Sequence, residues 1–164
     1  MEANSTDNKT FQLTENGQQL GELIYENLFF LKAEIKLLNS ELYDLAPVGF
    51  FGTSVAVTKN GNEIASLVMN WRGQIVITFQ DGQEFVIKLI GLFSNKFIIE
   101  NKDQEKLIQL ELKFNWREFH YNYNITYDIT NDNIPKDNLL LLLGVYAANY
   151  FVATMSGANA GMMY

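Results

Sequence analysis

Few side chains in this sequence are suited to catalysis. There is one histidine, His120, and no cysteine, which excludes multi-histidine metal sites, thiolate metal sites and cysteine nucleophiles. His120 stands between Phe119 and Tyr121 with no serine or aspartate motif beside it, so we expect an exposed strand residue rather than a catalytic base. The sequence also has no glycine-rich phosphate loop, nucleophile elbow or HExxH motif. These features predict a protein that is not an enzyme.

Calcium is the one cofactor that the sequence raises as an alternative to none. Asp128, Asp132 and Asp137 lie close together in a polar segment. As a calcium loop beginning at Asp128, this segment would lack the required glycine and would carry Leu139 in place of the bidentate glutamate. We therefore favour a solvated turn that ends in a helix N-cap at Asp137 or Asn138, and keep a calcium site as the alternative.

The elements that must position any functional residue are mainly β-strands. Between Phe11 and Asp128, apolar and polar residues alternate over short stretches that are separated by turn signals. In the stretch 107–114, for example, every second residue from Ile108 is apolar, and only Leu107 breaks the alternation. This pattern is typical of strands with one buried and one solvated face.

Turn signals recur at a fixed interval along this region. Each signal is followed by a glutamate, and the three units lie 21 residues apart: Asn60-Gly61-Asn62-Glu63, Asp81-Gly82-Gln83-Glu84 and Lys102-Asp103-Gln104-Glu105. We interpret this repeat as a series of β-hairpins, about eleven strands in an up-and-down meander. Because these glutamates begin strands, we expect them to face solvent.

The chain changes character after Asp128. A polar turn over 130–136 precedes an uninterrupted apolar run, 139–155, which predicts a helix over about 138–156. Five consecutive leucines, Leu139 to Leu143, cover every side of that helix. Such a helix must be enclosed, either by protein or by lipid.

The helix and the strands predict one architecture together. A closed barrel of about eleven strands is too wide to be filled by its own side chains. The helix would be roughly 28 Å long at 1.5 Å per residue, which matches strands that span about 25 Å. We therefore predict a mainly β fold: a closed up-and-down antiparallel barrel of about 11–12 strands that encloses a hydrophobic C-terminal helix. Asn149, in the middle of the helix, should then find a hydrogen-bond partner on the barrel wall.

Successive turns of such a meander lie at alternate ends of the barrel. One end collects polar turns, including Asn16-Gly17 and Asn60-Gly61, and we call it the polar end. The other, the aromatic end, collects the turns that contain both tryptophans. The candidate binding residues there are Phe29, Phe30, Phe50, Phe51, Trp71, Arg72, Phe93, Lys96, Trp116 and Arg117. They suit a membrane interface or a protein groove. The alternative is that the rings plug the barrel and that the tail 157–164 covers them.

Length and composition predict a single domain. The 164 residues are 48% hydrophobic and 19% charged, with a net charge of −7. This acidity argues against a nucleic-acid partner. We expect residues 1–8 to form a disordered polar tail and residues 9–164 to form the barrel domain, with strands over about 9–128 and a C-terminal tail at 157–164. The absence of cysteine, together with an N-terminus that has no signal-peptide features, favours a cytoplasmic protein.

The hairpin repeat, followed by a turn containing Pro135 and Asp137 and then the apolar stretch 139–152, resembles the tubby-like C-terminal superfamily, which includes LURP-one-related proteins and phospholipid scramblases. The resemblance implies a twelve-stranded barrel around a buried C-terminal helix. The basic cluster with which the tubby branch holds phosphoinositides has no counterpart here, and neither do the palmitoylated cysteines of the scramblases. In scramblases an acidic calcium segment precedes the helix, and Asp128, Asp132 and Asp137 lie in the corresponding region.

These observations predict a non-enzymatic intracellular binding module, cytoplasmic or peripheral to a membrane. It would dock a membrane phospholipid or a partner protein through the aromatic end. Two alternatives stay open: a lipocalin-like carrier with an apolar ligand inside the barrel, and a tail-anchored membrane protein that uses residues 139–155 as its anchor. The sequence predicts no oligomeric state.

Overall fold

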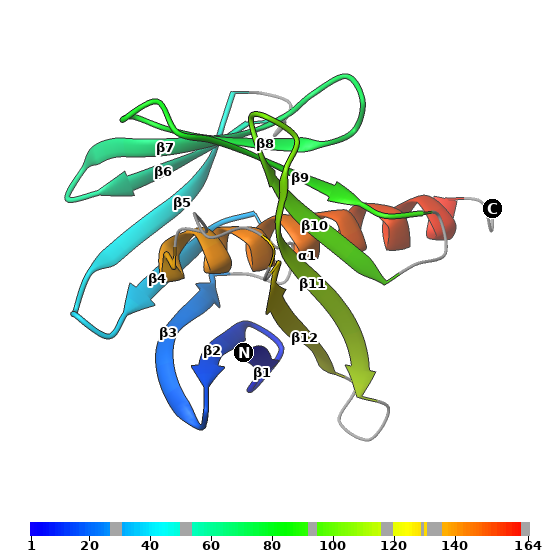
Figure 1. The fold of residues 1–164 in the computed structure, drawn as a ribbon, viewed down its shortest axis with the longest axis horizontal. Helices are drawn as coiled ribbons and strands as arrows, with labels where there is room; N and C mark the ends of the chain where they lie inside the picture. The colour runs from blue at the N-terminus through cyan, green and yellow to red at the C-terminus, as the bar shows by residue number, and fades with distance from the viewer. Residues whose placement is uncertain are drawn as a thin grey trace.

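The computed structural model describes residues 1–26, 31–49, 54–91, 95–115, 120–128, 130 and 136–161. Over these residues the chain forms strands β1 to β12 and one helix, α1 (Figure 1). Their bounds are β1 Glu2–Ser5, β2 Thr10–Glu15, β3 Gln18–Tyr25, β4 Ala33–Leu37, β5 Leu42–Val48, β6 Ser54–Lys59, β7 Asn62–Met69, β8 Ile75–Phe79, β9 Glu84–Leu89, β10 Lys96–Asn101, β11 Lys106–Asn115, β12 His120–Tyr127 and α1 Asn138–Gly161.

The strands form a closed antiparallel barrel in which each strand pairs with its neighbours in the chain. The predicted mainly β barrel of about 11–12 strands is therefore confirmed. The alternation of the sequence becomes the alternation of burial: in β4, Ala33 and Ile35 are buried while Glu34 and Lys36 lie toward solvent. The buried residues of all the strands line the interior of the barrel.

The twelfth strand comes from the N-terminus. β1 pairs with β2 on one side and with β12 on the other, and Ala3 is fully buried. The prediction of a disordered tail over residues 1–8 is therefore wrong for residues 2–5. The physical reason is that β2 and β12 would otherwise each leave a row of backbone N–H and C=O groups unpaired at an edge. The backbone of a polar segment can supply those hydrogen bonds as well as the backbone of an apolar segment.

Three hairpins contain a β-bulge just after the turn. The register skips Leu20 between β2 and β3, Ile64 between β6 and β7, and Leu107 between β10 and β11. An extra residue in one strand locally reverses which side chains face the core. This explains why Leu107 interrupts the alternation of the sequence, because both Leu107 and Ile108 are buried.

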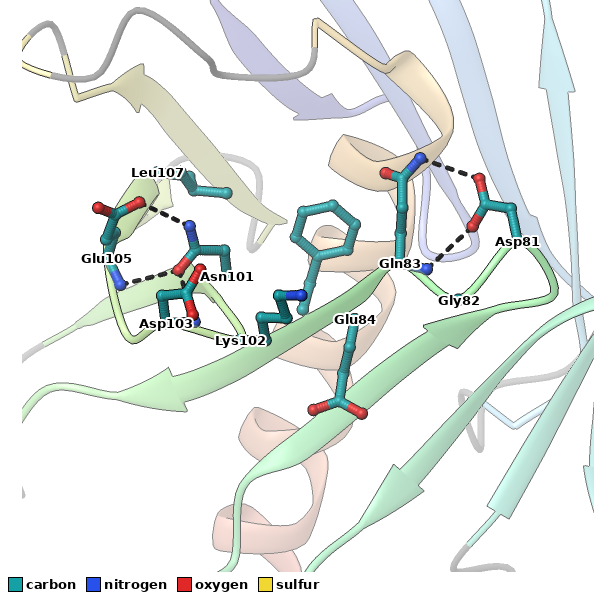
Figure 2. A pocket seen from close by; sticks show the side chains of 10 residues that line it. Asp81, Gly82, Gln83, Glu84, Asn101, Lys102, Asp103, Glu105 and Leu107 are labelled. Atoms are coloured by element: carbon teal, nitrogen blue, oxygen red, sulfur yellow. Dashed lines mark hydrogen bonds between the residues drawn. The ribbon is translucent and has the colours of Figure 1, made fainter.

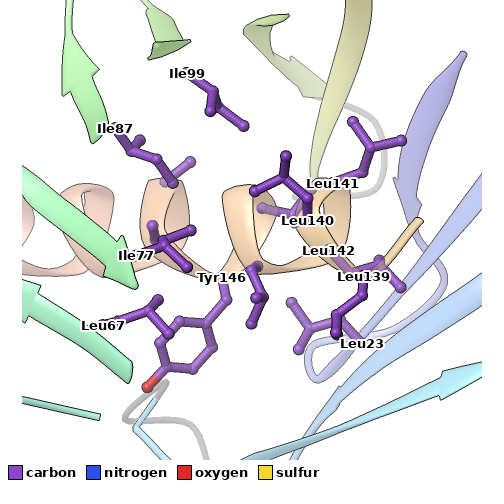
Figure 3. Close-up of a cluster of buried hydrophobic side chains, with 14 of the residues drawn as sticks. Leu23, Leu67, Ile77, Ile87, Ile99, Leu139, Leu140, Leu141, Leu142 and Tyr146 are labelled. Carbon is purple, nitrogen blue, oxygen red and sulfur yellow. The ribbon is translucent and has the colours of Figure 1, made fainter. Parts of the chain in front are cut away.

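Helix α1 fills the barrel, as predicted. Asp137 caps it, because its Oδ1 accepts the backbone N–H of Leu139 at 2.8 Å. The first leucines of α1 pack against strand residues from several sides of the barrel (Figure 3), and all five from Leu139 to Leu143 are buried. The helix continues to Gly161 rather than ending near 156. The predicted tail 157–164 is thus helical as far as 161.

One segment of α1, Asn138–Met155, is long and apolar enough to cross a membrane, but 67% of it is buried inside the barrel. Its N-terminal turns lie within the ring of strands, and its C-terminal turns emerge on the other side (Figure 1). Length and hydropathy alone therefore do not separate a core helix from an anchor here. Burial of most of the segment is typical of a core helix.

Candidate docking end of the barrel

Because the strands follow one another around the barrel, consecutive connections lie at opposite ends, as predicted. α1 begins at the polar end, after β12. It reaches the aromatic end at Tyr146, whose hydroxyl donates a hydrogen bond to the carbonyl of Leu31, just before β4, at 2.7 Å. Met155 in the emerging part of α1 is exposed.

Trp71 is the most exposed large apolar side chain among the described residues, with 87% of its surface accessible. It lies in the turn between β7 and β8. Asn70 fixes this turn, because its side-chain oxygen accepts the backbone N–H groups of Arg72 and Gln74 at 3.0 Å each. Gly73 adopts a φ of 71°, which glycine tolerates best. The turn thus holds the indole in solvent instead of folding it into the barrel.

The guanidinium of Arg72 lies over the Trp71 ring at 4.9 Å from its centroid. This cation–π contact keeps a positive charge beside an exposed apolar surface. Other apolar side chains exposed near this end are Val48, Val68 and Ile90. Lys96, at the start of β10, is exposed at the same end. The structure therefore places Trp71, Arg72 and Lys96 at the predicted end.

The remaining predicted binding residues, Phe29, Phe30, Phe50, Phe51, Phe93, Trp116 and Arg117, lie outside the described residues, as does the end of the tail, 162–164. Whether the tail covers the aromatic turns therefore stays a prediction. The side chain of His120 also lies outside the description.

Charge is distributed unevenly between the two ends. At the polar end, carboxylates outnumber lysines: Glu15, Glu41, Glu63, Asp81, Glu84, Asp103, Glu105, Asp128 and Asp137 against Lys59, Lys102, Lys106 and Lys136. At the aromatic end, the described basic residues outnumber the acidic ones: Lys9, Lys32, Arg72 and Lys96 against Asp7 and Glu26. The acidic net charge is therefore carried mainly by the end opposite Trp71.

A network of buried hydroxyls lies beneath the aromatic end. The Tyr123 hydroxyl donates to Oδ1 of Asn149 at 2.7 Å, and the Nδ2 of Asn149 donates to the Tyr25 hydroxyl at 3.0 Å. Asn149 thus finds its partners on the barrel wall, as predicted. Burial raises the pKa of Tyr25, of Tyr123 and of Tyr146, whose ring stacks on that of Tyr25. These phenols stay neutral and act as structural hydrogen-bond partners.

Two of the predicted calcium ligands, Asp128 and Asp137, make local hydrogen bonds. Asp128 accepts the backbone N–H and the hydroxyl of Thr130, which lower the pKa of Asp128. Asp137 caps α1, and Asp132 lies outside the described residues. Within the described ranges, no group of three or more His, Cys, Asp or Glu side chains could hold a metal ion. The geometry supports the turn and N-cap that we favoured, and calcium binding stays an untested alternative.

A groove of about 510 Å³ lies at the polar end, between the β8–β9 and β10–β11 turns (Figure 2). The sequence did not predict it. Buried Phe85 and Leu107 contribute its apolar surface. Asp81 and Asn101 are occupied by hydrogen bonds within their own turns. The only feature of the sequence related to this groove is the repeated turn-then-glutamate unit. The repeat shows that similar turns recur, but it does not show that two of them lie next to each other.

Glu41 lies in a cluster of polar side chains at the polar end. An ion pair with Lys59, and hydrogen bonds from Asn39 and the Tyr43 hydroxyl, lower the pKa of Glu41 to about 2. Each of these groups has a partner within the polar end. The cluster is therefore a structural ion-pair network rather than an acid poised for proton transfer.

No family model, curated protein or solved structure matches this chain. The resemblance to the tubby-like superfamily therefore stays a prediction.

Proposed function

We propose that this protein is a non-enzymatic intracellular binding module that docks onto a phospholipid membrane, as a peripheral protein, through its aromatic end. The observation that carries the proposal is the exposure of Trp71 on a turn that its own hydrogen bonds fix. An indole held in water gains free energy by moving to a membrane interface, where its ring is buried and its N–H stays hydrated.

The charges at the two ends support a membrane over a protein partner. Arg72 and Lys96 place positive charge beside the exposed apolar side chains, which suits an anionic lipid surface. The acidic polar end would point away from that surface. The net charge of −7 therefore does not argue against anionic lipid, because repulsion between the polar end and the membrane is screened over about 10 Å of salt solution.

The position of α1 argues against the two alternative functions. In a lipocalin-like carrier the ligand would occupy the lumen, where the leucines of α1 lie. A tail anchor would have to withdraw α1 and expose the apolar lining of the barrel to water, at a cost of about 25 cal/mol for each Å² of apolar surface. Peripheral docking leaves the core intact.

Co-sedimentation with vesicles tests the proposal. The full chain should pellet with vesicles of phosphatidylcholine and phosphatidylserine, and less with phosphatidylcholine alone. Trp71→Ala should lower the bound fraction several-fold. The matched control is Leu38→Ala, which truncates another exposed apolar side chain, 60% accessible, at the polar end.

Equal binding by Trp71→Ala and Leu38→Ala would contradict docking through Trp71. Failure of the unmodified chain to bind vesicles of either composition would remove the membrane as partner. The aromatic end would then be proposed as a protein-binding surface, and binding of a protein partner would be compared between Trp71→Ala and Leu38→Ala.

A further inference from the structure

The outer surface of β5 to β9 differs from the rest of the barrel wall. Two consecutive rows of the register carry no charged side chain on β5 to β8. One row consists of Val48, Ser54, Val68, Val76 and Val86. The other consists of Ala46, Ala56, Ser66 and Thr78, and on β9 it ends at the exposed Glu84, toward the polar end. The strand residues between them, such as Val55, Leu67 and Ile77, are buried inside the barrel, so these rows face outward. We call this surface the valine face.

The valine face continues into the aromatic end. Val68 is two residues before Asn70, which anchors the Trp71 turn, and Ile90 follows β9 directly. Val48 and Val68 are 52% and 43% accessible, values typical of unpartnered surface. Strands β6, β7 and β8 lie side by side along one side of the molecule (Figure 1). Among the described residues of the aromatic end, the exposed apolar side chains Val48, Val68, Trp71 and Ile90 thus lie along this sector of the barrel.

Positive charge borders this sector. Arg72 lies over Trp71, and Lys96 is exposed at the start of the next strand, β10. On β10 the valine row continues to Glu100, which pairs with Val86 in the register. Lys88 neutralises it at 2.7 Å. The row from Val48 to Val86 therefore presents no unpaired carboxylate to an anionic surface, and the carboxylate of the second row, Glu84, lies toward the polar end.

The opposite part of the wall is charged. The outward row through β2, β3 and β4 consists of Gln12, Glu22 and Lys36. Glu34 on β4 stands directly opposite Asp44 on β5. Burying these charged side chains would cost free energy, so this side of the barrel favours contact with water.

We propose that the barrel docks on the membrane tilted, with the valine face and Trp71 turned toward the lipid and the β1–β4 side raised into water. This orientation rests on the proposed function and specifies it. A second copy of the chain fits the face less well. Five strands and two rows cover roughly 20 Å by 14 Å, whereas a stable interface needs about 800 Å² from each partner. Contact with lipid requires no such minimum area, and it would include Trp71 as well as the valine face.

Site-specific labels test the orientation, and the absence of cysteine makes them simple to place. Val68→Cys puts a label on the valine face, and Lys113→Cys puts one on the outward face of β11, also near the aromatic end. Each variant carries an environment-sensitive fluorophore. Each is mixed with phosphatidylcholine–phosphatidylserine vesicles that contain lipids brominated on their acyl chains, and quenching is measured once co-sedimentation shows equal binding.

The tilted orientation predicts quenching several-fold stronger at position 68 than at position 113. Equal quenching at both positions would overturn it in favour of upright docking, while leaving the proposed function in place. Stronger quenching at 113 would also overturn it. If neither variant nor the unmodified chain binds vesicles, the proposed function fails, and the orientation fails with it.

Discussion

Asn149 shows how one residue organises the interior of the barrel. It is 5% accessible and joins hydroxyls of two strands, Tyr123 on β12 and Tyr25 on β3. Its need for partners follows from the sequence alone, because an amide in the middle of an apolar helix must be satisfied. The identity of the partners does not, since it depends on which strands the helix faces at that level. The bond therefore sets the register of α1 in the barrel.

Removing this amide should destabilise the fold. We predict that Asn149→Leu lowers the free energy of unfolding by about 2–3 kcal/mol, because the Tyr123 and Tyr25 hydroxyls lose a buried partner. Urea denaturation measures the change. The control is the same substitution with Tyr25→Phe and Tyr123→Phe, in which the polar groups are removed together and much of the loss should be recovered. Equal losses in both backgrounds would show that the hydrogen bonds contribute little.

At the scale of elements, hairpins and helix follow from the sequence, while the close approaches between them do not. Alternation and the 21-residue repeat predict the strands, and the capped apolar run predicts α1. The bulges at Leu20 and Ile64 leave no comparable mark, because only Leu107 visibly breaks its pattern. Gly21 lies where β3 meets α1: a Cβ there would be 2.9 Å from the Lys36 carbonyl oxygen and 3.1 Å from the Leu142 side chain.

Two glycine substitutions separate backbone from side-chain crowding. Gly21→Ala should lower the free energy of unfolding by about 1–3 kcal/mol, because the backbone of β4 cannot yield easily. In Gly144→Ala the new Cβ meets the end of the Ile99 side chain at 2.8 Å. That methyl group can rotate away, and alanine favours the helix by about 1 kcal/mol, so the net change should be smaller. Urea denaturation of both variants decides the order, and the reverse order would contradict the packing described.

At the scale of the whole molecule, the barrel around its helix follows from two physical requirements: a wide barrel must be filled, and an apolar helix must be enclosed. The strand formed by residues 2–5 could not be foreseen, since its sequence is polar and only barrel closure demands it. The docking end was predicted in part. Alternating turns place Trp71 and Arg72 there, but the valine face depends on cross-strand register, which no single segment of the sequence reveals.

The central claim is that the exposed indole of Trp71 enters a membrane interface, and its own fluorescence tests this most directly. Trp116→Phe leaves Trp71 as the one tryptophan. In water its emission should be that of a solvated indole, as its 87% accessibility requires. Phosphatidylcholine–phosphatidylserine vesicles should shift that emission to shorter wavelength in a saturable manner. Emission that stays unchanged at every lipid concentration would contradict the account.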